Sequence, residues 1–224
     1  MTAVDTSQVA SRVAQIRQRI VAAGGNEVKL IAVTKTFDAA AIVAAFDAGC
    51  DGVGENYAQE LIAKVRELPN TKRLPVHFIG RLQTNKVKSI AEIIDVWQTV
   101  DRAELINEIA KRCIKQNTGV KPQIMLQVNA TSEPDKGGCS PADASTLLEL
   151  ATSKGLDVLG LMTVGPTNNE PQQARQAFRT TRKLADDLGL KQCSMGMTGD
   201  LEIAIAEGAT MIRVGSALFG PRDS

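Results

Sequence analysis

The 224-residue sequence contains few of the groups that mark a specialised binding surface. Aromatic residues make up 3% of the chain, too few for the stacking platforms that hold single-stranded nucleic acids. The formal net charge of +1 predicts no general attraction to nucleic acid or to an anionic membrane. No apolar run approaches the length of a membrane span, and the first residues lack the apolar core of a signal peptide. We therefore expect a cytoplasmic protein without a nucleic-acid or membrane partner.

Cysteine and histidine, the usual ligands of structural zinc, are also scarce. The four cysteines form no Cys-x-x-Cys pair and His77 is the only histidine, so the sequence predicts no zinc site. Scattered free thiols are typical of proteins in a reducing compartment.

Short apolar segments alternate with amphipathic helical segments along the chain. The expected strands are residues 29–34, 52–54, 76–80, 95–100, 122–128, 157–162, 192–194 and 211–214. An extra helix is expected near residues 6–23. This alternation implies parallel strands with helical crossovers, so we predict an α/β (β/α)8 TIM barrel; the alternative is an open doubly wound sheet. No linker-like stretch divides residues 1–224, which we expect to form one domain.

Lys35 lies just beyond the apolar segment KLIAV, where the first strand is expected to end. TIM-barrel enzymes carry their reactive groups at this end of the strands. A lysine amine attacks an aldehyde only in its neutral form, which partial burial favours. Lys35 is therefore a candidate for covalent binding of an aldehyde. The alternative is that the strand simply stops and the lysine reaches water.

Two glycine-containing segments, SMGMTGD (194–200) and RVGSALFG (213–220), follow the seventh and eighth expected strands. TIM barrels often bind phosphate with these two loops, because exposed backbone N–H groups there attract anions. A lysine that traps aldehydes and a phosphate site together suit pyridoxal 5′-phosphate. They suit a sugar-phosphate aldolase equally well, so the pair does not identify the ligand.

Six segments together identify a family. AVTK, GENY, HFIGRLQTNK, GLMT, SMGMTGD and RVGSALFG occur in this order and resemble the pyridoxal phosphate homeostasis protein family, single-domain relatives of the alanine racemase barrel. The resemblance covers nearly the whole chain and implies pyridoxal 5′-phosphate as the cofactor. It assigns the cofactor site to Lys35, Asn56, His77, Met162, Ser194, Thr198, Arg213, Gly215 and Ser216.

Within that assignment, Lys35 is implied to hold the cofactor covalently and Arg213 to face the pyridine nitrogen. Ser194, Gly215 and Ser216, with Thr198, are implied to surround the phosphate, and the other residues to border the pocket. An arginine stays protonated and can only donate, so the nitrogen opposite it stays unprotonated and the ring withdraws electrons poorly.

The resemblance and Arg213 together predict a non-catalytic protein that binds pyridoxal 5′-phosphate, serves its intracellular homeostasis and hands it to apo-enzymes. The alternative is a weak racemase-like pyridoxal enzyme, in which His77 or Tyr57 would be the second acid–base group. With no arm or second domain evident in the sequence, we expect a monomer.

Two further segments remain. The family's pattern E-x-x-K-x-G after the fifth strand is largely kept by Glu133, Lys136 and Gly138, and its role stays open. GRLQTNKV resembles a P-loop but lacks the second glycine and the hydroxyl residue, so we reject that interpretation.

The same region contains a small basic cluster, Arg81, Lys86 and Lys88. We interpret it as a solvated helix face, with an acidic docking partner as the alternative.

Overall fold

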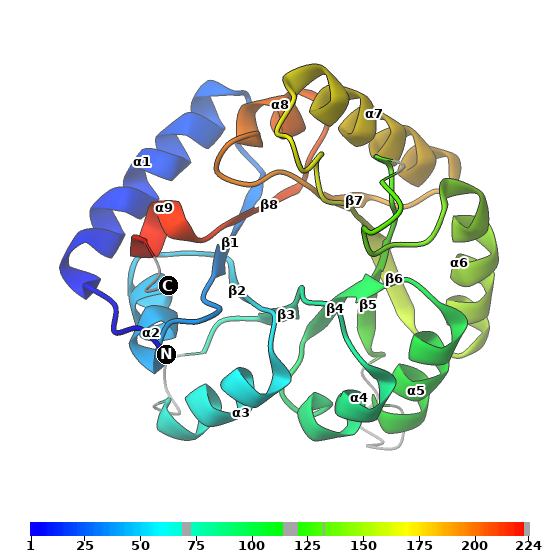
Figure 1. Cartoon of the computed structure of the whole chain (residues 1–224), viewed down its shortest axis with the longest axis horizontal. Coiled ribbons are helices and arrows are strands. Elements are labelled where there is room, and N and C mark those ends of the chain that lie inside the picture. Colours follow the sequence, from blue (N-terminus) through cyan, green and yellow to red (C-terminus); the bar gives the residue numbers. More distant parts are fainter. Residues whose placement is uncertain (69–72, 114–120, 132, 222–224) are drawn as a thin grey trace.

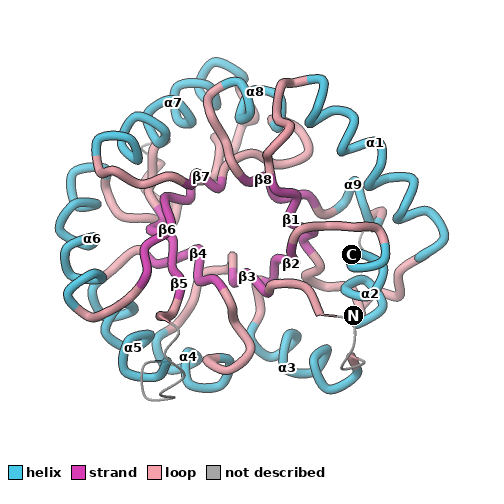
Figure 2. Tube along the Cα trace, turned by 180° about the vertical axis from the view of Figure 1, so that it is seen from behind, coloured by secondary structure: helices cyan, strands magenta, loops and turns pink. Residues whose placement is uncertain are grey.

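The computed structural model describes residues 1–68, 73–113, 121–131 and 133–221. Its strands form a closed parallel barrel in the order β1 to β8, with β8 paired to β1. Helices surround the ring of strands on all sides (Figure 1), and the view from behind shows the same arrangement (Figure 2). The predicted TIM barrel is confirmed.

The element boundaries follow the hydrophobic pattern closely. The strands are β1 (Lys29–Val33), β2 (Gly52–Glu55), β3 (Val76–Phe78), β4 (Val96–Val100), β5 (Gln123–Gln127), β6 (Asp157–Met162), β7 (Gln192–Ser194) and β8 (Met211–Val214). The α-helices are α1 (Val9–Ala22), α2 (Ala39–Asp47), α3 (Ala58–Glu67), α4 (Thr84–Ile90), α5 (Ala103–Cys113), α6 (Ala144–Ser153), α7 (Pro171–Asp187), α8 (Leu201–Ala206) and α9 (Ser216–Phe219). Among the described residues, no helix is both long and apolar enough to cross a membrane.

The expected extra N-terminal helix is α1, which follows a short 3-10 turn at Thr6–Gln8. Its buried residues recur at helical spacing and pack on the barrel. Two of its arginines bind the loops at the carboxyl ends of the last strands. Arg12 Nη1 donates to Leu218 O at 3.2 Å, and Arg19 Nη2 donates to Thr198 O at 2.9 Å. The helix therefore supports the segments predicted to bind phosphate.

A buried polar network lies behind the end of β1. The Lys64 ammonium on α3 donates to the carbonyl of Thr34 at 2.7 Å and to Glu55 Oε1 at 2.6 Å. Thr34 Oγ1 donates to the same carboxylate oxygen at 2.7 Å. The side chains of Lys64 and Glu55 have no exposed surface, so water cannot replace either partner.

One turn earlier on α3, Glu60 Oε2 accepts a hydrogen bond from the backbone N–H of Thr36 at 2.8 Å. Thr36 has a φ of 71°, a left-handed conformation that is unusual for a β-branched residue. We call Glu60 and Lys64 the α3 clamp, because they bind the residues directly before and after Lys35. The clamp fixes the backbone from which that lysine projects.

We expect Lys64→Met to lower the free energy of unfolding by about 3–5 kcal/mol, because it leaves the Glu55 carboxylate buried without its partner. Burial already raises the pKa of Glu55, and Lys64 opposes that rise. Urea unfolding monitored by circular dichroism measures the change. Arg66→Met, at an exposed position of the same helix, is the control and should shift stability by less than about 0.5 kcal/mol. Equal losses in the two variants would show that the buried pair contributes nothing specific.

Candidate functional site

A cavity of about 350 Å³ opens at the carboxyl ends of the strands. It is lined by Val33, Lys35, Asn56, Ile79, Met162, Val164, Met197, Thr198, Gly199, Arg213, Gly215 and Ser216. All the predicted site residues except His77 and Ser194 are in this lining. Loops that are far apart in the sequence therefore meet in one space, as the barrel topology requires.

Lys35 enters the cavity from the turn after β1 and is half-buried. Val33 and Ile79 bring apolar surface to the same space. A primary amine in a partly dry cavity has the surroundings that favour addition to an aldehyde.

The loops after β7 and β8 supply donors for an anion. Among the described residues, the backbone N–H groups of Thr198, Gly199 and Ser216 donate to no backbone or side-chain acceptor. Thr198 and Ser216 add hydroxyl groups, and all three residues line the cavity. Helix α9 is only one turn long, so its dipole adds little and the local N–H groups provide most of the attraction.

The β7 loop has a fixed shape because its own residues bind one another. Asp200 Oδ1 accepts from the backbone N–H of Met197 at 2.6 Å. Gly196 has a φ of 92°, and a Cβ atom there would lie 2.5 Å from the Cβ of Ala204. A glycine is therefore required at position 196, and the loop is held ready for a ligand.

Arg213 reaches the cavity from β8 and is 4% exposed. Its Nη1 donates to Ser194 Oγ and its Nη2 donates to Thr163 O, both at 2.8 Å. Burial lowers the pKa of Arg213 to about 10, and the carboxylate of Asp200 opposes the change. The guanidinium thus stays protonated at neutral pH and can offer only donors to a ligand.

Ser194 and His77 lie in the barrel interior behind Arg213. Ser194 Oγ donates to Gln98 Oε1 at 2.6 Å, and Gln98 Nε2 lies 2.7 Å from His77 Nδ1. Burial lowers the pKa of His77 to about 4, which keeps the imidazole neutral at pH 7. Direct contact of Ser194 or His77 with a cofactor stays a prediction, and the structure shows instead how both support Arg213.

Some residues of the site were not predicted. Ile79 and Val164 line the cavity, and each comes within two residues of the end of its strand. Gln98 is a fully buried polar residue in the middle of β4, VWQTV. A polar side chain inside a run of buried residues is the signal that could have identified it, since such a group requires hydrogen-bond partners.

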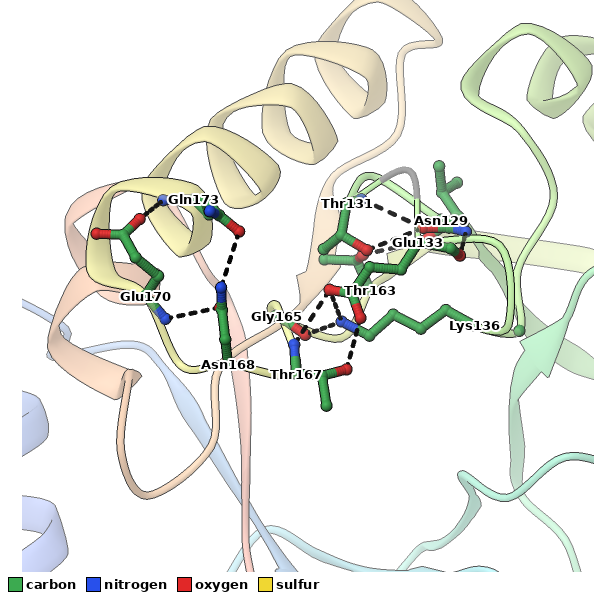
Figure 3. A network of polar contacts seen from close by, with 12 residues as sticks. Asn129, Thr131, Glu133, Lys136, Thr163, Gly165, Thr167, Asn168, Glu170 and Gln173 are labelled. Atoms are coloured by element: carbon green, nitrogen blue, oxygen red, sulfur yellow. Dashed lines mark hydrogen bonds and ion pairs between the residues drawn. The ribbon is translucent and has the colours of Figure 1, made fainter.

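The loop after β5, whose role the sequence leaves open, braces the loop after β6 (Figure 3). The Lys136 ammonium donates to Glu133 Oε1 at 2.9 Å and to the carbonyl of Gly165. Thr167 Oγ1 donates to the other Glu133 oxygen at 2.5 Å. Hydrogen bonds from Thr167 and Lys136 lower the pKa of Glu133 to about 2, so the brace keeps its charge at neutral pH. It holds the segment that brings Val164 to the cavity.

Metal or thiolate chemistry has no support in the described ranges. Within them, no three His, Cys, Asp or Glu residues are arranged to hold a metal ion. Burial raises the pKa of Cys50, Cys139 and Cys193 to about 11, so these thiols stay protonated at pH 7.

The neutral state of His77 makes stability depend on pH. Because the folded pKa of about 4 lies below the unfolded value of 6.5, the unfolded chain binds more protons between these values. We expect the free energy of unfolding to fall by up to about 3 kcal/mol as the pH drops through this window. Chemical unfolding at several pH values measures this loss, and His77→Asn should flatten the profile over the same range. Parallel profiles for the two proteins would contradict a buried neutral imidazole.

Comparison with known proteins places the chain among relatives with this architecture. It matches the alanine racemase N-terminal domain family over residues 4–223. It is 41% identical to a pyridoxal phosphate homeostasis protein of Pseudomonas aeruginosa, over 96% of this chain and 94% of the relative. The corresponding Escherichia coli protein is 37% identical, over 97% of this chain and 98% of the relative.

Solved structures of related proteins have the same fold as this chain. PipY of Synechococcus elongatus, solved with pyridoxal phosphate bound, has 36% identity and a TM-score of 0.84 over 95% of this chain and 100% of that one. Alanine racemase of Bartonella henselae, at 13% identity and a TM-score of 0.76, shares the fold over 98% of this chain and 60% of its own length. As its motifs predict, the chain belongs to the alanine racemase N-terminal domain family and, within it, to the pyridoxal phosphate homeostasis proteins.

Proposed function

We propose that this protein holds pyridoxal 5′-phosphate on Lys35 and serves the intracellular homeostasis of that cofactor. The observation that carries the proposal is the common cavity. A lysine amine, a buried arginine and a group of unbonded backbone N–H donors line one space of about 350 Å³.

The residues present fit the chemical parts of this cofactor. Its phosphate suits the N–H and hydroxyl groups of Thr198 and Ser216, and its pyridine nitrogen suits a donor from Arg213. When bound, the cofactor supplies an aldehyde that condenses with a lysine amine and releases water. Lys35 is the lysine that lines the cavity, and the α3 clamp holds the backbone on both sides of it.

The lining favours binding over turnover. Among the described residues of the cavity wall, Lys35 and Arg213 are the ionisable ones, and Arg213 remains protonated. His77 is neutral and turned toward Gln98, while Tyr57 lines a different pocket. A racemase needs a second group that exchanges a proton on the other face of the substrate, and neither candidate is in the wall. The protein therefore acts as a carrier that transfers the cofactor to apo-enzymes. It does so as a monomer with one domain.

We expect protein mixed with pyridoxal 5′-phosphate to become yellow and to retain the cofactor after borohydride reduction. Lys35→Ala should lose both properties, because the amine that reacts with the aldehyde is gone. Lys29→Ala removes an exposed lysine at the other end of the same strand and should behave as the wild type. Mass spectrometry of the reduced proteins gives the labelled position. A stable adduct in Lys35→Ala would contradict the assignment, and a colourless protein that traps a keto-phosphate would favour an aldolase.

The racemase-like alternative has a separate test. Loaded protein incubated with alanine or serine in deuterated water should show no more deuterium at Cα than free cofactor does, because no second acid–base group lines the described cavity wall. Proton NMR of the amino acid follows the exchange. Exchange above the free-cofactor rate that disappears in Lys35→Ala would establish catalysis instead.

A further inference from the structure

A second, larger pocket lies beside the Lys35 cavity. Its volume is about 710 Å³, within the range of small-molecule sites, roughly 300–1,000 Å³. Residues from the carboxyl ends of β2, β3 and β4 line it, at positions 56–59, 81–83 and 101–102. Asn56 lines both spaces, so the two pockets are neighbours at the same mouth of the barrel.

The charges in this pocket are not balanced. Asp101 Oδ1 lies 2.6 Å from Arg102 Nη1, and Arg102 Nη2 donates to Leu82 O at 2.7 Å, so this ion pair is self-contained. Arg81 and Lys86 also line the pocket, and no carboxylate in the described ranges lies within ion-pair distance of either. Two positive charges without a carboxylate partner in the described ranges therefore line this pocket, Arg81 from an exposed position and Lys86 from a half-buried one.

The basic cluster, interpreted from the sequence as a solvated helix face, agrees with the structure in part, since Arg81 is exposed. Lys88 is exposed and outside the pocket, as that expectation requires. Lys86, on the same helix α4, is half-buried and forms part of the pocket wall. The cluster therefore contains one lysine that faces solvent and one that faces a cavity.

The remaining walls suit a molecule with an apolar body. Phe78 and Leu82 are buried beneath the pocket, at 1% and 4% exposure. Tyr57, at 50% exposure, offers its ring on the rim.

We propose that this pocket is a second ligand site, for a small phosphate monoester with an aromatic or apolar body. A phosphate dianion matches two unpaired cations, and the guanidinium of Arg81 can bind two phosphate oxygens at once. Phe78, Leu82 and Tyr57 receive the body of the ligand. The site goes beyond the proposed carrier function and, except for Asn56, uses none of the residues around Lys35.

The test fills the Lys35 cavity first. Protein is loaded with pyridoxal 5′-phosphate and reduced with borohydride, and phenyl phosphate is then titrated by calorimetry. We expect one further site in the wild type, and affinity at least about tenfold lower in Arg81→Ala and Lys86→Ala, the loss of one charge-assisted contact. Lys88→Ala makes the same charge change on the same helix and should bind as the wild type. Equal weakening in Lys86→Ala and Lys88→Ala would overturn the site, as would no binding at all.

Two other ligands test whether the pocket prefers a phosphate monoester with an apolar body. Inorganic phosphate should bind more weakly than phenyl phosphate, since it has no apolar body, and equal affinity would overturn the role given to Tyr57 and Phe78. Benzoate carries a single charge and should also bind more weakly, and equal affinity would overturn the choice of phosphate. Thermal unfolding of each variant, and the conservative variant Lys86→Gln, exclude misfolding as the cause of a loss of phenyl phosphate affinity.

The yellow colour before reduction keeps the two proposals apart. Arg81→Ala and Lys86→Ala should take up pyridoxal 5′-phosphate as the wild type does, because neither residue lines the Lys35 cavity. If pyridoxal 5′-phosphate is taken up normally but phenyl phosphate binding does not depend on Lys86, the second ligand site is refuted and the carrier function is not. Failed uptake in the wild type refutes the carrier function instead.

Discussion

The α3 clamp is the constraint on which the cofactor site depends. It binds the peptide groups directly before and after Lys35, through the Thr34 carbonyl and the Thr36 N–H. A lysine side chain is long and flexible, so its amine is placed reproducibly only if its backbone is fixed. The clamp also keeps Thr36 in a left-handed conformation, and such local strain persists only where the surroundings over-determine it. The fully buried Lys64 makes the contact insensitive to water and salt.

A second chain of hydrogen bonds crosses the barrel interior and fixes Arg213. The guanidinium donates to Ser194, whose hydroxyl donates to Gln98, and the Gln98 amide faces His77 Nδ1. This order of donors and acceptors requires Nδ1 to accept, which a neutral imidazole can do and a protonated one cannot. Burial lowers the pKa of His77, and the neutral imidazole that results is the form this network requires. The polar residues of this network thus occupy positions in the barrel interior that layers of apolar side chains fill in most TIM barrels.

The sequence predicted what depends on local rules. Strand positions followed from apolar runs, and the glycines that end helices in the sequence pattern have positive φ values, at Gly49, Gly155, Gly189 and Gly208. Which side chains face the cavity depends on how the barrel closes, and no local pattern encodes that. In the structure the Ser194 hydroxyl donates to Gln98, a contact that the sequence does not predict, and its assignment to the phosphate stays a prediction. The buried Glu55–Lys64 pair could not be predicted either. A charged residue on a helix is usually solvated, so the sequence gives no sign that Lys64 is buried.

The two pockets share Asn56 and otherwise present different groups to a ligand. A Cβ atom on Gly80 would lie 2.2 Å from the carbonyl oxygen of Asn56, so the loops after β2 and β3 touch through their backbones. Thr99 Oγ1 donates to the Gly80 carbonyl at 2.7 Å and holds this contact from β4. This contact fixes the backbone of Asn56, the residue that lines both pockets. The charges of Arg81 and Lys86 therefore serve the second pocket, and the free N–H donors near Thr198 serve the first.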